Sequence, residues 1–208
     1  MTAPRTSHKP HSPACDRNQE PILTVLRELY REPLTVLEIG SGTGQHAVYM
    51  GRHLPHVAWL TSDRAENHAG IWQWLTETPM LNVEPPLELD VCMEKWPVQD
   101  LDAIFSANTA HIMSWPAVEC MFIGAGRKLP AGGSLALYGP FNIDGEYTSA
   151  SNRAFDQQLR ARDPEMGIRD TADLNHLARA NGLVLESDHP LPANNRILVW
   201  RKDPPPVH

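Results

Sequence analysis

The stretch Leu34-Thr-Val-Leu-Glu-Ile-Gly-Ser-Gly-Thr-Gly44 joins six largely apolar residues to three closely spaced glycines. Apolar and β-branched residues that run into glycines predict a strand ending in a sharp turn. The residues from 45 to 54 then continue in a helical pattern. Because strand, glycine turn and helix in this order open a βαβ unit, the stretch predicts an α/β fold with a ligand loop after its first strand.

The alternation of strands and helices continues along the chain. Further elements are predicted as strands at 56–61, 86–90, 101–107 and 134–138 and as helices at 66–76 and 116–128. Most of these strands are apolar, which is typical of a parallel sheet covered by helices on both faces.

The two ends of the chain differ from this central pattern. Helices are predicted at 21–30, with Pro21 in the first turn, and at 149–162 and 170–181, and strands at 183–186 and 197–200 form an antiparallel pair joined by a loop at 188–196. Residues 1–13 and 203–208 have little to bury, so we expect disordered tails there and one folded domain over residues 14–202.

Composition limits the class of protein. The chain has 208 residues, 41% of them hydrophobic, and a net charge of −7. This suits one soluble domain and argues against a nucleic-acid-binding protein, which needs a basic face. No apolar run resembles a signal peptide or a membrane span, so we expect a cytoplasmic location. The three cysteines lack metal-ligand spacing and are expected to be reduced thiols, with no metal site.

Three acidic residues accompany the glycine loop. The loop reads GxGxG, whereas a dinucleotide fingerprint would read GxGxxG, which disfavours a nicotinamide-linked oxidoreductase. Glu38 precedes the loop and suits a ligand with an amino group. Asp63 ends the second strand, where a carboxylate can accept from ribose hydroxyls, although a helix N-cap is the alternative. Asp90 ends the predicted third strand and could accept from an adenine amino group or form a turn.

The run from Val36 to Gly44, together with Asp63 and Asp90, resembles the class I S-adenosylmethionine-dependent methyltransferases. More narrowly, the chain resembles the methyltransferase-like protein 26 family, which is described largely as a domain of unknown function. The stretches that carry this narrower resemblance span nearly the whole chain and are Ser12-Pro-Ala-Cys-Asp-Arg-Asn18, Ser106-Ala-Asn-Thr-Ala-His-Ile112, Tyr138-Gly-Pro-Phe141, Ser151-Asn152, Arg162-Asp-Pro164, Gly167-Ile-Arg-Asp170 and Pro192-Ala-Asn-Asn195.

The resemblance implies a Rossmann-like fold with a seven-stranded sheet whose last strand is antiparallel. It also implies S-adenosylmethionine (SAM) as cofactor and S-adenosylhomocysteine (SAH) as product. In this reading Asp63 holds the ribose and Asp90 the adenine. The methionine part is held by Glu38 and by the loop residues Gly40, Ser41, Gly42 and Gly44. The resemblance supplies no methyl acceptor.

Residues 108–115 follow the fourth strand, where an open α/β sheet has its ligand crevice. Asn108 is therefore expected beside the cofactor. His111 could take a proton from an amine, hydroxyl or thiol during methyl transfer, although a capping or packing histidine is the alternative. The loop lacks the Asn/Asp-Pro-Pro-Tyr sequence of many enzymes that methylate nucleic-acid bases or glutamine.

Polar and aromatic residues later in the chain could line a substrate pocket, although turns and solvated helix faces also explain such residues. The candidates are Trp115, Tyr138, Tyr147, Asn152, Arg160, Arg169, Asn194 and Asn195. If two of the arginines converge, the acceptor carries a carboxylate or a phosphate. Arg17 and Asn18 precede the predicted first helix and could latch an N-terminal arm over the cofactor, or cap that helix.

The sequence therefore predicts a SAM-dependent methyltransferase that acts on a small polar molecule. The alternative is a non-catalytic protein that binds SAM or SAH and serves as a sensor or partner subunit. The expected partner is a small-molecule substrate, with neither nucleic acid nor membrane, and the chain is expected to be a monomer or a homodimer.

Overall fold

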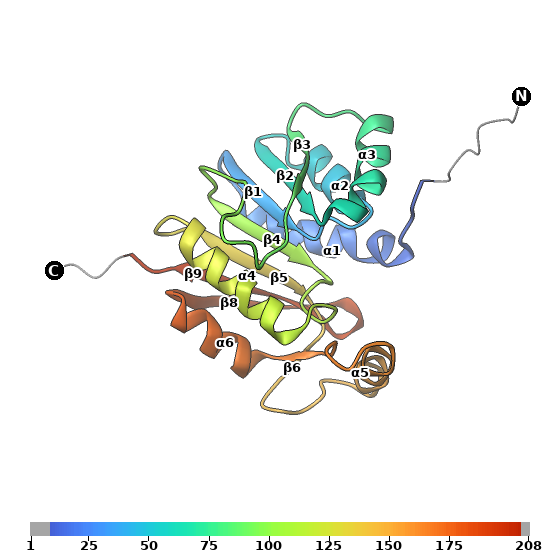
Figure 1. The fold of residues 1–208 in the computed structure, drawn as a ribbon, viewed down its shortest axis with the longest axis vertical. Helices are drawn as coiled ribbons and strands as arrows, with labels where there is room; N and C mark the ends of the chain where they lie inside the picture. The colour runs from blue at the N-terminus through green and yellow to red at the C-terminus, as the bar shows by residue number, and fades with distance from the viewer. Residues whose placement is uncertain (1–8, 205–208) are drawn as a thin grey trace, which may run out of the picture.

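The structure, a computed structural model, describes residues 9–204 and is built around a seven-stranded sheet (Figure 1). The strands follow the spatial order β3-β2-β1-β4-β5-β9-β8. Their bounds are Leu34–Ile39 (β1), Val57–Asp63 (β2), Val83–Glu88 (β3), Ala103–Ala107 (β4), Ser134–Gly139 (β5), Leu183–Leu191 (β8) and Asn195–Lys202 (β9).

The pairing of the strands confirms the predicted fold class. Strand β1 pairs in parallel with both β2 and β4, and β4 pairs in parallel with β5. The last strand, β9, is antiparallel to β5 and to β8. The chain builds β2 and β3 on one side of β1 and then crosses to β4 and β5 on the other. This reversal opens a crevice at the carboxyl ends of β1 and β4.

Helices cover both faces of the sheet (Figure 1). One face packs against α4 and α6, and the other against α1 and α2, while α3 lies against β3. The bounds of the helices are Pro13–Leu29 (α1), Gln45–His53 (α2), His68–Glu77 (α3), Trp115–Lys128 (α4), Ala150–Arg162 (α5) and Thr171–Ala180 (α6).

Successive side chains along each central strand point to opposite faces of the sheet, so each strand contributes to two hydrophobic cores, one on each face. In β1, Val36 packs on the side of α1 and α2, and Leu37 packs on the side of α4 and α6. Each core holds a fully buried tryptophan, Trp59 in the first and Trp200 in the second. Because both faces are covered, the central strands are nearly continuous apolar runs.

Helix α1 begins earlier than the sequence indicated. The predicted helix started at Pro21, but Pro13 is the proline in the first turn and Pro21 lies inside the helix. A proline at this interior position removes one backbone donor. The helix continues because the following turns bury Ile22, Leu23 and Leu26 completely.

Residues 9–12 contact the body of the protein, within the stretch predicted as a disordered tail. The Pro10 carbonyl accepts from the Trp74 indole N–H at 2.7 Å. Lys9 lies over the Trp74 ring and pairs with Glu77 at 2.6 Å. At the other end, within the predicted tail 203–208, the Asp203 amide donates to the Gly182 carbonyl at 3.0 Å. Residues 1–8 and 205–208 lie outside the described part of the chain.

The predicted loop at 188–196 is mostly strand. Strand β8 runs on to Leu191 and β9 already begins at Asn195. Pro190 is tolerated because β8 is at the edge of the sheet, where a missing N–H breaks no ladder on the open side. The short connection is possible because Ala193 and Asn194 adopt left-handed backbone angles.

The prediction that all three cysteines are reduced thiols is wrong for Cys92 and Cys120. Cys92 and Cys120 form a disulfide with their Cα atoms 5.0 Å apart, and Cys15 is free. The pairing arises because the segment after β3 lies against α4, a tertiary contact between residues 28 positions apart. The spacing of cysteines along the sequence does not predict a disulfide of this kind.

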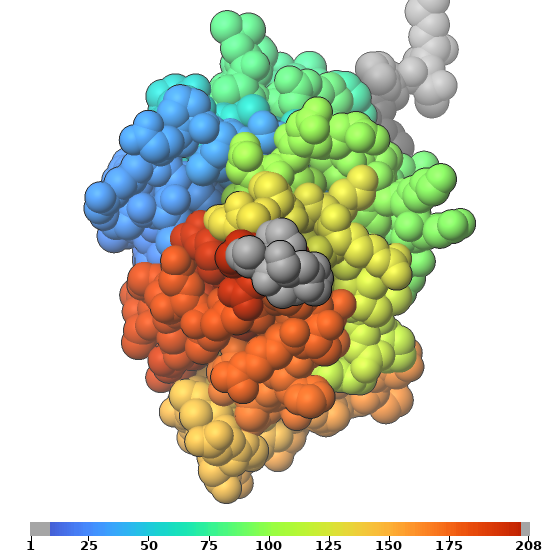
Figure 2. All heavy atoms as spheres, turned by 90° about the vertical axis from the view of Figure 1, so that its left-hand side faces the viewer, coloured from blue at the N-terminus to red at the C-terminus, as the bar shows by residue number. Residues whose placement is uncertain are grey.

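A second sheet pairs β6 (Phe141–Asn142) with β7 (Arg169–Asp170) beside α5. Figure 2 shows a face of the molecule on which segments late in the described chain, in orange and red, cover much of the surface. Within residues 9–204, no helix has the length and apolar character to cross a membrane.

Candidate functional site

A cavity of about 610 Å³ opens at the carboxyl ends of β1, β2 and β4. Five of the predicted cofactor residues line this cavity, and they are Gly40, Gly42, Asp63, Asp90 and Asn108. Its remaining wall combines the segment after β3 with the loop and first turn of α4, and includes Leu89, Cys92, Ile112, Met113 and Ala117. The crevice expected from the strand order is therefore present as a cavity.

The glycine loop requires glycine for two separate reasons. Gly40 has a φ of +73°, and a Cβ there would lie 2.8 Å from the Thr109 methyl group. Gly44 has a φ of +89° and packs against the backbone of Ile71 in α3. The loop therefore sits against both α3 and the segment after β4, with backbone rather than side chains facing the cavity.

Glu38 lies behind the loop, almost completely buried. Its carboxylate accepts from the Ser41 hydroxyl at 2.8 Å and from the Trp59 indole N–H at 3.1 Å. Burial raises the pKa of this carboxyl to about 7, and the nearby Asp63 carboxylate adds to the rise. Glu38 thus fixes the loop through Ser41 and is poised to ionise near neutral pH, particularly beside a cation.

Asp63 joins the end of β2 to the glycine loop. One carboxylate oxygen accepts from the Gly42 amide at 2.8 Å, and the other accepts from the Arg64 amide and from the Asn67 side chain. The carboxylate also lines the cavity. Each carboxylate oxygen can accept about two hydrogen bonds, so the oxygen facing Gly42 retains acceptor capacity toward a ligand.

Asp90 begins the turn after β3. One of its carboxylate oxygens accepts from the Cys92 amide at 2.9 Å. This hydrogen bond stabilises the turn, the role that the sequence offered as the alternative to ligand binding. Because its side chain also lines the cavity, the two roles are compatible. Asp90 and Asp63 therefore place carboxylates on neighbouring walls of one cavity.

Asn108 and His111 occupy the segment after β4 but face different surroundings. Asn108 has a φ of +57° and lines the cavity. His111 is buried outside the cavity lining, with its ring 5.2 Å from that of Phe155. Burial lowers the pKa of His111 to about 4, and the Arg169 charge contributes. The imidazole is therefore neutral at physiological pH.

Arg17 and Asn18 lie on α1, inside the helix rather than before it. Arg17 is exposed, whereas the buried Asn18 carbonyl oxygen lies 2.7 Å from Nε2 of His46. The Cys15 sulfur lies 3.9 Å from the other ring nitrogen of that histidine. Sequence reasoning missed His46 and Cys15, although His46 follows the last glycine of the loop by only two positions.

Tyr138, predicted as a substrate residue, is buried at the end of β5. Its carbonyl accepts from the Asn108 amide at 2.9 Å. Burial raises the pKa of its phenol, against the opposing effect of a hydrogen bond with Asn18. Tyr138 therefore connects α1 to the segment after β4.

Arg169 clamps the segment after β4 in place. Its guanidinium donates to the carbonyls of Ala110, Met113 and Glu165, and it lies over the ring of Trp115. Burial lowers the pKa of this guanidinium, and the Arg160 charge adds to the effect. The donors of Arg169 are directed at the protein backbone.

The remaining substrate candidates surround α5. Tyr147 and Arg160 both donate to Asp156, at 2.7 and 2.8 Å. The Asn152 side chain donates to the Asn194 carbonyl at 3.1 Å, which joins α5 to the β8–β9 connection. Asn195 bonds within its own turn. The structure thus brings Tyr147 together with Arg160, and Asn152 with Asn194, outside the lining of the main cavity.

Arg169→Met should lower the free energy of unfolding by about 3 kcal/mol, because buried carbonyls would lose charged donors. Arg162→Met, at an exposed position of α5, is the matched control and should change stability by less than about 0.5 kcal/mol. Chemical denaturation of both variants measures the difference. A loss below about 1 kcal/mol for Arg169→Met would show that Arg169 does not clamp this segment.

Among residues 9–204, no group of three or more His, Cys, Asp or Glu side chains could hold a metal ion. The polar and charged residues that line the cavity include Asp63, Arg64, Asn67, Asp90, Asn108, Thr109 and Ser114.

Comparisons with solved structures agree with the fold. The chain matches the S-adenosylmethionine-dependent methyltransferase SibL with a TM-score of 0.78 at 17% identity, covering 92% of this chain and 56% of that one. An O-methyltransferase family protein from Burkholderia thailandensis matches with a TM-score of 0.79 at 16% identity, covering 91% and 57%. Human N-acetylserotonin methyltransferase in complex with SAM matches with a TM-score of 0.77 at 15% identity, covering 92% and 53%.

These neighbours share the fold with this chain, and the chain spans little more than half of their length. A family model described as "Protein of unknown function (DUF938)" matches residues 9–202, nearly all of the described chain. The chain therefore belongs to the DUF938 family of proteins of unknown function.

Proposed function

We propose that this protein is a SAM-dependent methyltransferase acting on a small polar molecule. The observation that carries the proposal is the cavity at the carboxyl ends of β1, β2 and β4, with Asp63 and Asp90 in its walls beside the glycine loop. The neighbours named above share this fold, and they include a SAM-dependent methyltransferase and a methyltransferase in complex with SAM. The resemblance to the methyltransferase-like protein 26 family remains part of the proposal.

The residues present fit SAM. A ligand with an adenosyl group needs acceptors for ribose hydroxyls and for the adenine amino group, and Asp63 and Asp90 supply them. The positive φ of Gly40 and the missing Cβ leave the backbone of the loop free to approach the methionine part. Glu38, whose pKa burial raises to about 7, favours a ligand that carries an ammonium group.

When bound, SAM supplies an electrophilic methyl group, and the chain must align the acceptor and exclude water. We assign the alignment to Asn108 and Tyr138, which the hydrogen bond between their backbones holds together. His111 is proposed to take the acceptor's proton, since burial keeps its imidazole neutral above about pH 4. Its position outside the cavity lining means that an acceptor would have to reach it from the side of α5.

The contacts of Arg160 and Arg169 bear on whether the methyl acceptor carries an anionic group. Arg169 donates to backbone carbonyls and Arg160 pairs with Asp156, so these two do not form a free anion site. A carboxylate or phosphate on the acceptor would therefore have to be bound elsewhere. We propose a polar acceptor with a hydroxyl, amine or thiol as the methylated group.

A screen with isotope-labelled methyl groups tests this function. The protein is incubated with labelled SAM and pooled small acceptors that carry hydroxyl, amine or thiol groups, and label in each pool is measured. Transfer that is lost in Asp63→Ala supports the proposal. If SAM binds but no pool becomes labelled, the alternative of a non-catalytic SAM-binding sensor or partner subunit gains support.

A further inference from the structure

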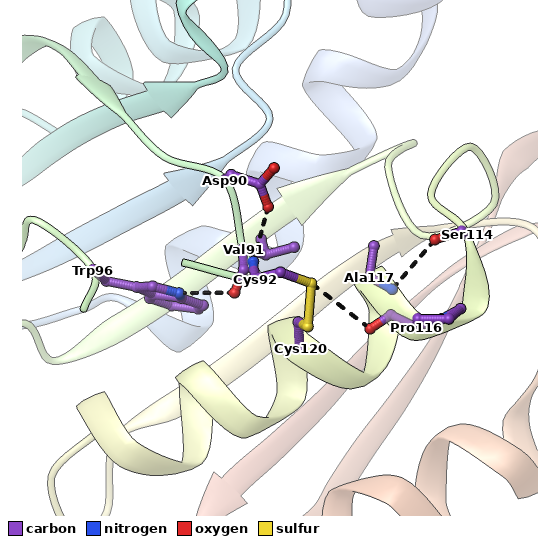
Figure 3. The surroundings of a disulfide bond; sticks show 8 residues. All are labelled: Asp90, Val91, Cys92, Trp96, Ser114, Pro116, Ala117 and Cys120. Carbon is purple, nitrogen blue, oxygen red and sulfur yellow. Dashed lines mark hydrogen bonds between the residues drawn. A yellow bond between two sulfur atoms is a disulfide. The ribbon is translucent and has the colours of Figure 1, made fainter. Parts of the chain in front are cut away.

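Cys92 lines the candidate cofactor cavity, and its disulfide to Cys120 joins the segment after β3 to α4 (Figure 3). Cys92 follows Asp90 by two residues and is exposed, whereas Cys120 lies on α4 and is partly buried. The bond therefore joins the segment after β3 to the helix whose first turn, at Pro116 and Ala117, lines the same cavity. A covalent link thus connects two walls that the adenine would touch.

The segment held by this bond carries Asp90. The Cys92 amide donates to the Asp90 carboxylate at 2.9 Å, so the position of Cys92 fixes the orientation of that carboxylate (Figure 3). Trp96, four residues further on, is buried and donates to the Val91 carbonyl at 3.0 Å. The segment between Asp90 and Trp96 is therefore anchored in the core at its far end and to α4 by the disulfide.

A second hollow, of about 220 Å³, reaches the disulfide from the other side. Cys92 lines both this hollow and the cofactor cavity, while Cys120 lines the hollow alone. Arg127 and Lys128, in the last turn of α4, line the hollow together with Glu94. Lys128 donates to the Val98 carbonyl at 2.7 Å, so the attraction of the hollow for an anion comes mainly from Arg127. A small thiol with carboxylate groups can therefore approach the exposed Cys92 sulfur without entering the cofactor cavity.

We propose that Cys92 and Cys120 form a reversible redox site that exchanges with small anionic thiols and sets the affinity of the cofactor cavity. The thiolate of a small thiol attacks the Cys92 sulfur, forms a mixed disulfide and releases Cys120 as a thiolate that takes a proton. A second small thiol attacks the mixed disulfide and releases a small disulfide and the Cys92 thiol. Two thiols are oxidised and the protein disulfide is reduced by two electrons, and the reverse reaction restores it.

Reduction should weaken cofactor binding because it removes the covalent link between the Asp90 segment and α4. The segment stays attached through Trp96, so the change is confined to the adenine end of the cavity. The expected weakening is about five- to tenfold in the Kd for SAH, the lower part of the range for coupled sites. This coupling rests on the proposed function, whereas the exchange reaction does not.

The experiment equilibrates the protein in glutathione and glutathione disulfide at a series of ratios. Alkylation and mass spectrometry then count free thiols at Cys92 and Cys120. Hydrogen exchange of residues 89–96 and calorimetry with SAH are recorded in the oxidised and reduced states. We expect reversible conversion of the pair, faster exchange of these amides after reduction, and the stated change in Kd. Arg127→Ala should slow exchange with glutathione but not with the uncharged thiol 2-mercaptoethanol.

Two variants serve as controls. The double variant Cys92→Ser/Cys120→Ser should behave like the reduced protein in every buffer, and Cys15→Ser should retain the full response. A pair that stays oxidised or reduced at all ratios would overturn the proposal, as would unchanged hydrogen exchange and Kd. If neither state binds SAH, the proposed function fails, and thiol counts with hydrogen exchange still decide the redox site.

Discussion

Asp63→Ala should abolish measurable binding of SAM and SAH, with a Kd at least about 100-fold higher than that of the wild type. Each hydrogen bond to a charged group contributes roughly 1.5–3 kcal/mol, and the ribose would lose up to two of them. The variant also loses the acceptor of the Gly42 amide, so the glycine loop would be less well ordered. Isothermal titration with SAH measures the effect.

Asp188→Ala is the matched control for this substitution. Asp188 lies on the edge strand β8 and pairs with Arg196, far along the sheet from β2. Its removal should leave the Kd for SAH unchanged, and circular dichroism should show that both variants are folded. An Asp63→Ala protein that is folded and binds SAH within about threefold of the wild type would exclude Asp63 as the ribose ligand.

Glu38→Gln should stabilise the ligand-free protein at pH 8, while weakening its binding of SAM. In the folded state burial raises the pKa of Glu38 from the ordinary 4.5 to about 7. The folded protein therefore holds more protons than the unfolded chain between these pH values, and its free energy of unfolding falls as pH rises through this window. Glutamine cannot ionise, so it avoids a loss that reaches about 3 kcal/mol above pH 7.

The measurement is the difference in unfolding free energy between Glu38→Gln and the wild type, at several pH values from 4.5 to 8. The difference should grow in favour of the variant as pH rises. The exposed Glu32→Gln is the control for replacing a glutamate by glutamine and should change the free energy of unfolding by less than about 0.5 kcal/mol. A flat difference for Glu38→Gln would show that Glu38 ionises with its ordinary pKa in the folded protein.

The same substitution tests the role of Glu38 toward the cofactor. A neutral amide cannot pair with an ammonium group, so the Kd for SAM should rise at least about tenfold at pH 8. A more stable protein that binds its ligand less well would identify Glu38 as a residue kept for binding at the expense of stability.

The sequence predicted the central architecture because local signals there agree with the tertiary structure. The apolar run before the glycines specified β1, and the change from apolar strand to helical periodicity placed α2 within one residue of its observed end. Asp63 and Asp90 could be placed in one site because the carboxyl ends of parallel strands meet at one edge of the sheet. The order and direction of the strands are therefore enough to predict that these two carboxylates lie near each other.

Features that depend on distant contacts were not predictable. The start of α1 was misplaced because Pro21 resembles a first-turn proline, and only packing on the sheet shows that the helix passes through it. The Cys92–Cys120 pair depends on the approach of the segment after β3 to α4. The backbone contacts of Arg169 could not be read from the sequence either, because two of the three carbonyls to which it donates, those of Ala110 and Met113, belong to residues more than 50 positions away.

Calorimetric titration of the wild-type protein measures whether the cavity beside the glycine loop binds SAM. SAM, SAH and NAD are titrated separately into the same folded sample. We expect Kd values in the micromolar range for SAM and SAH, one molecule per chain, and no binding of NAD. A folded sample that binds neither SAM nor SAH, or that binds NAD as tightly, would contradict this expectation.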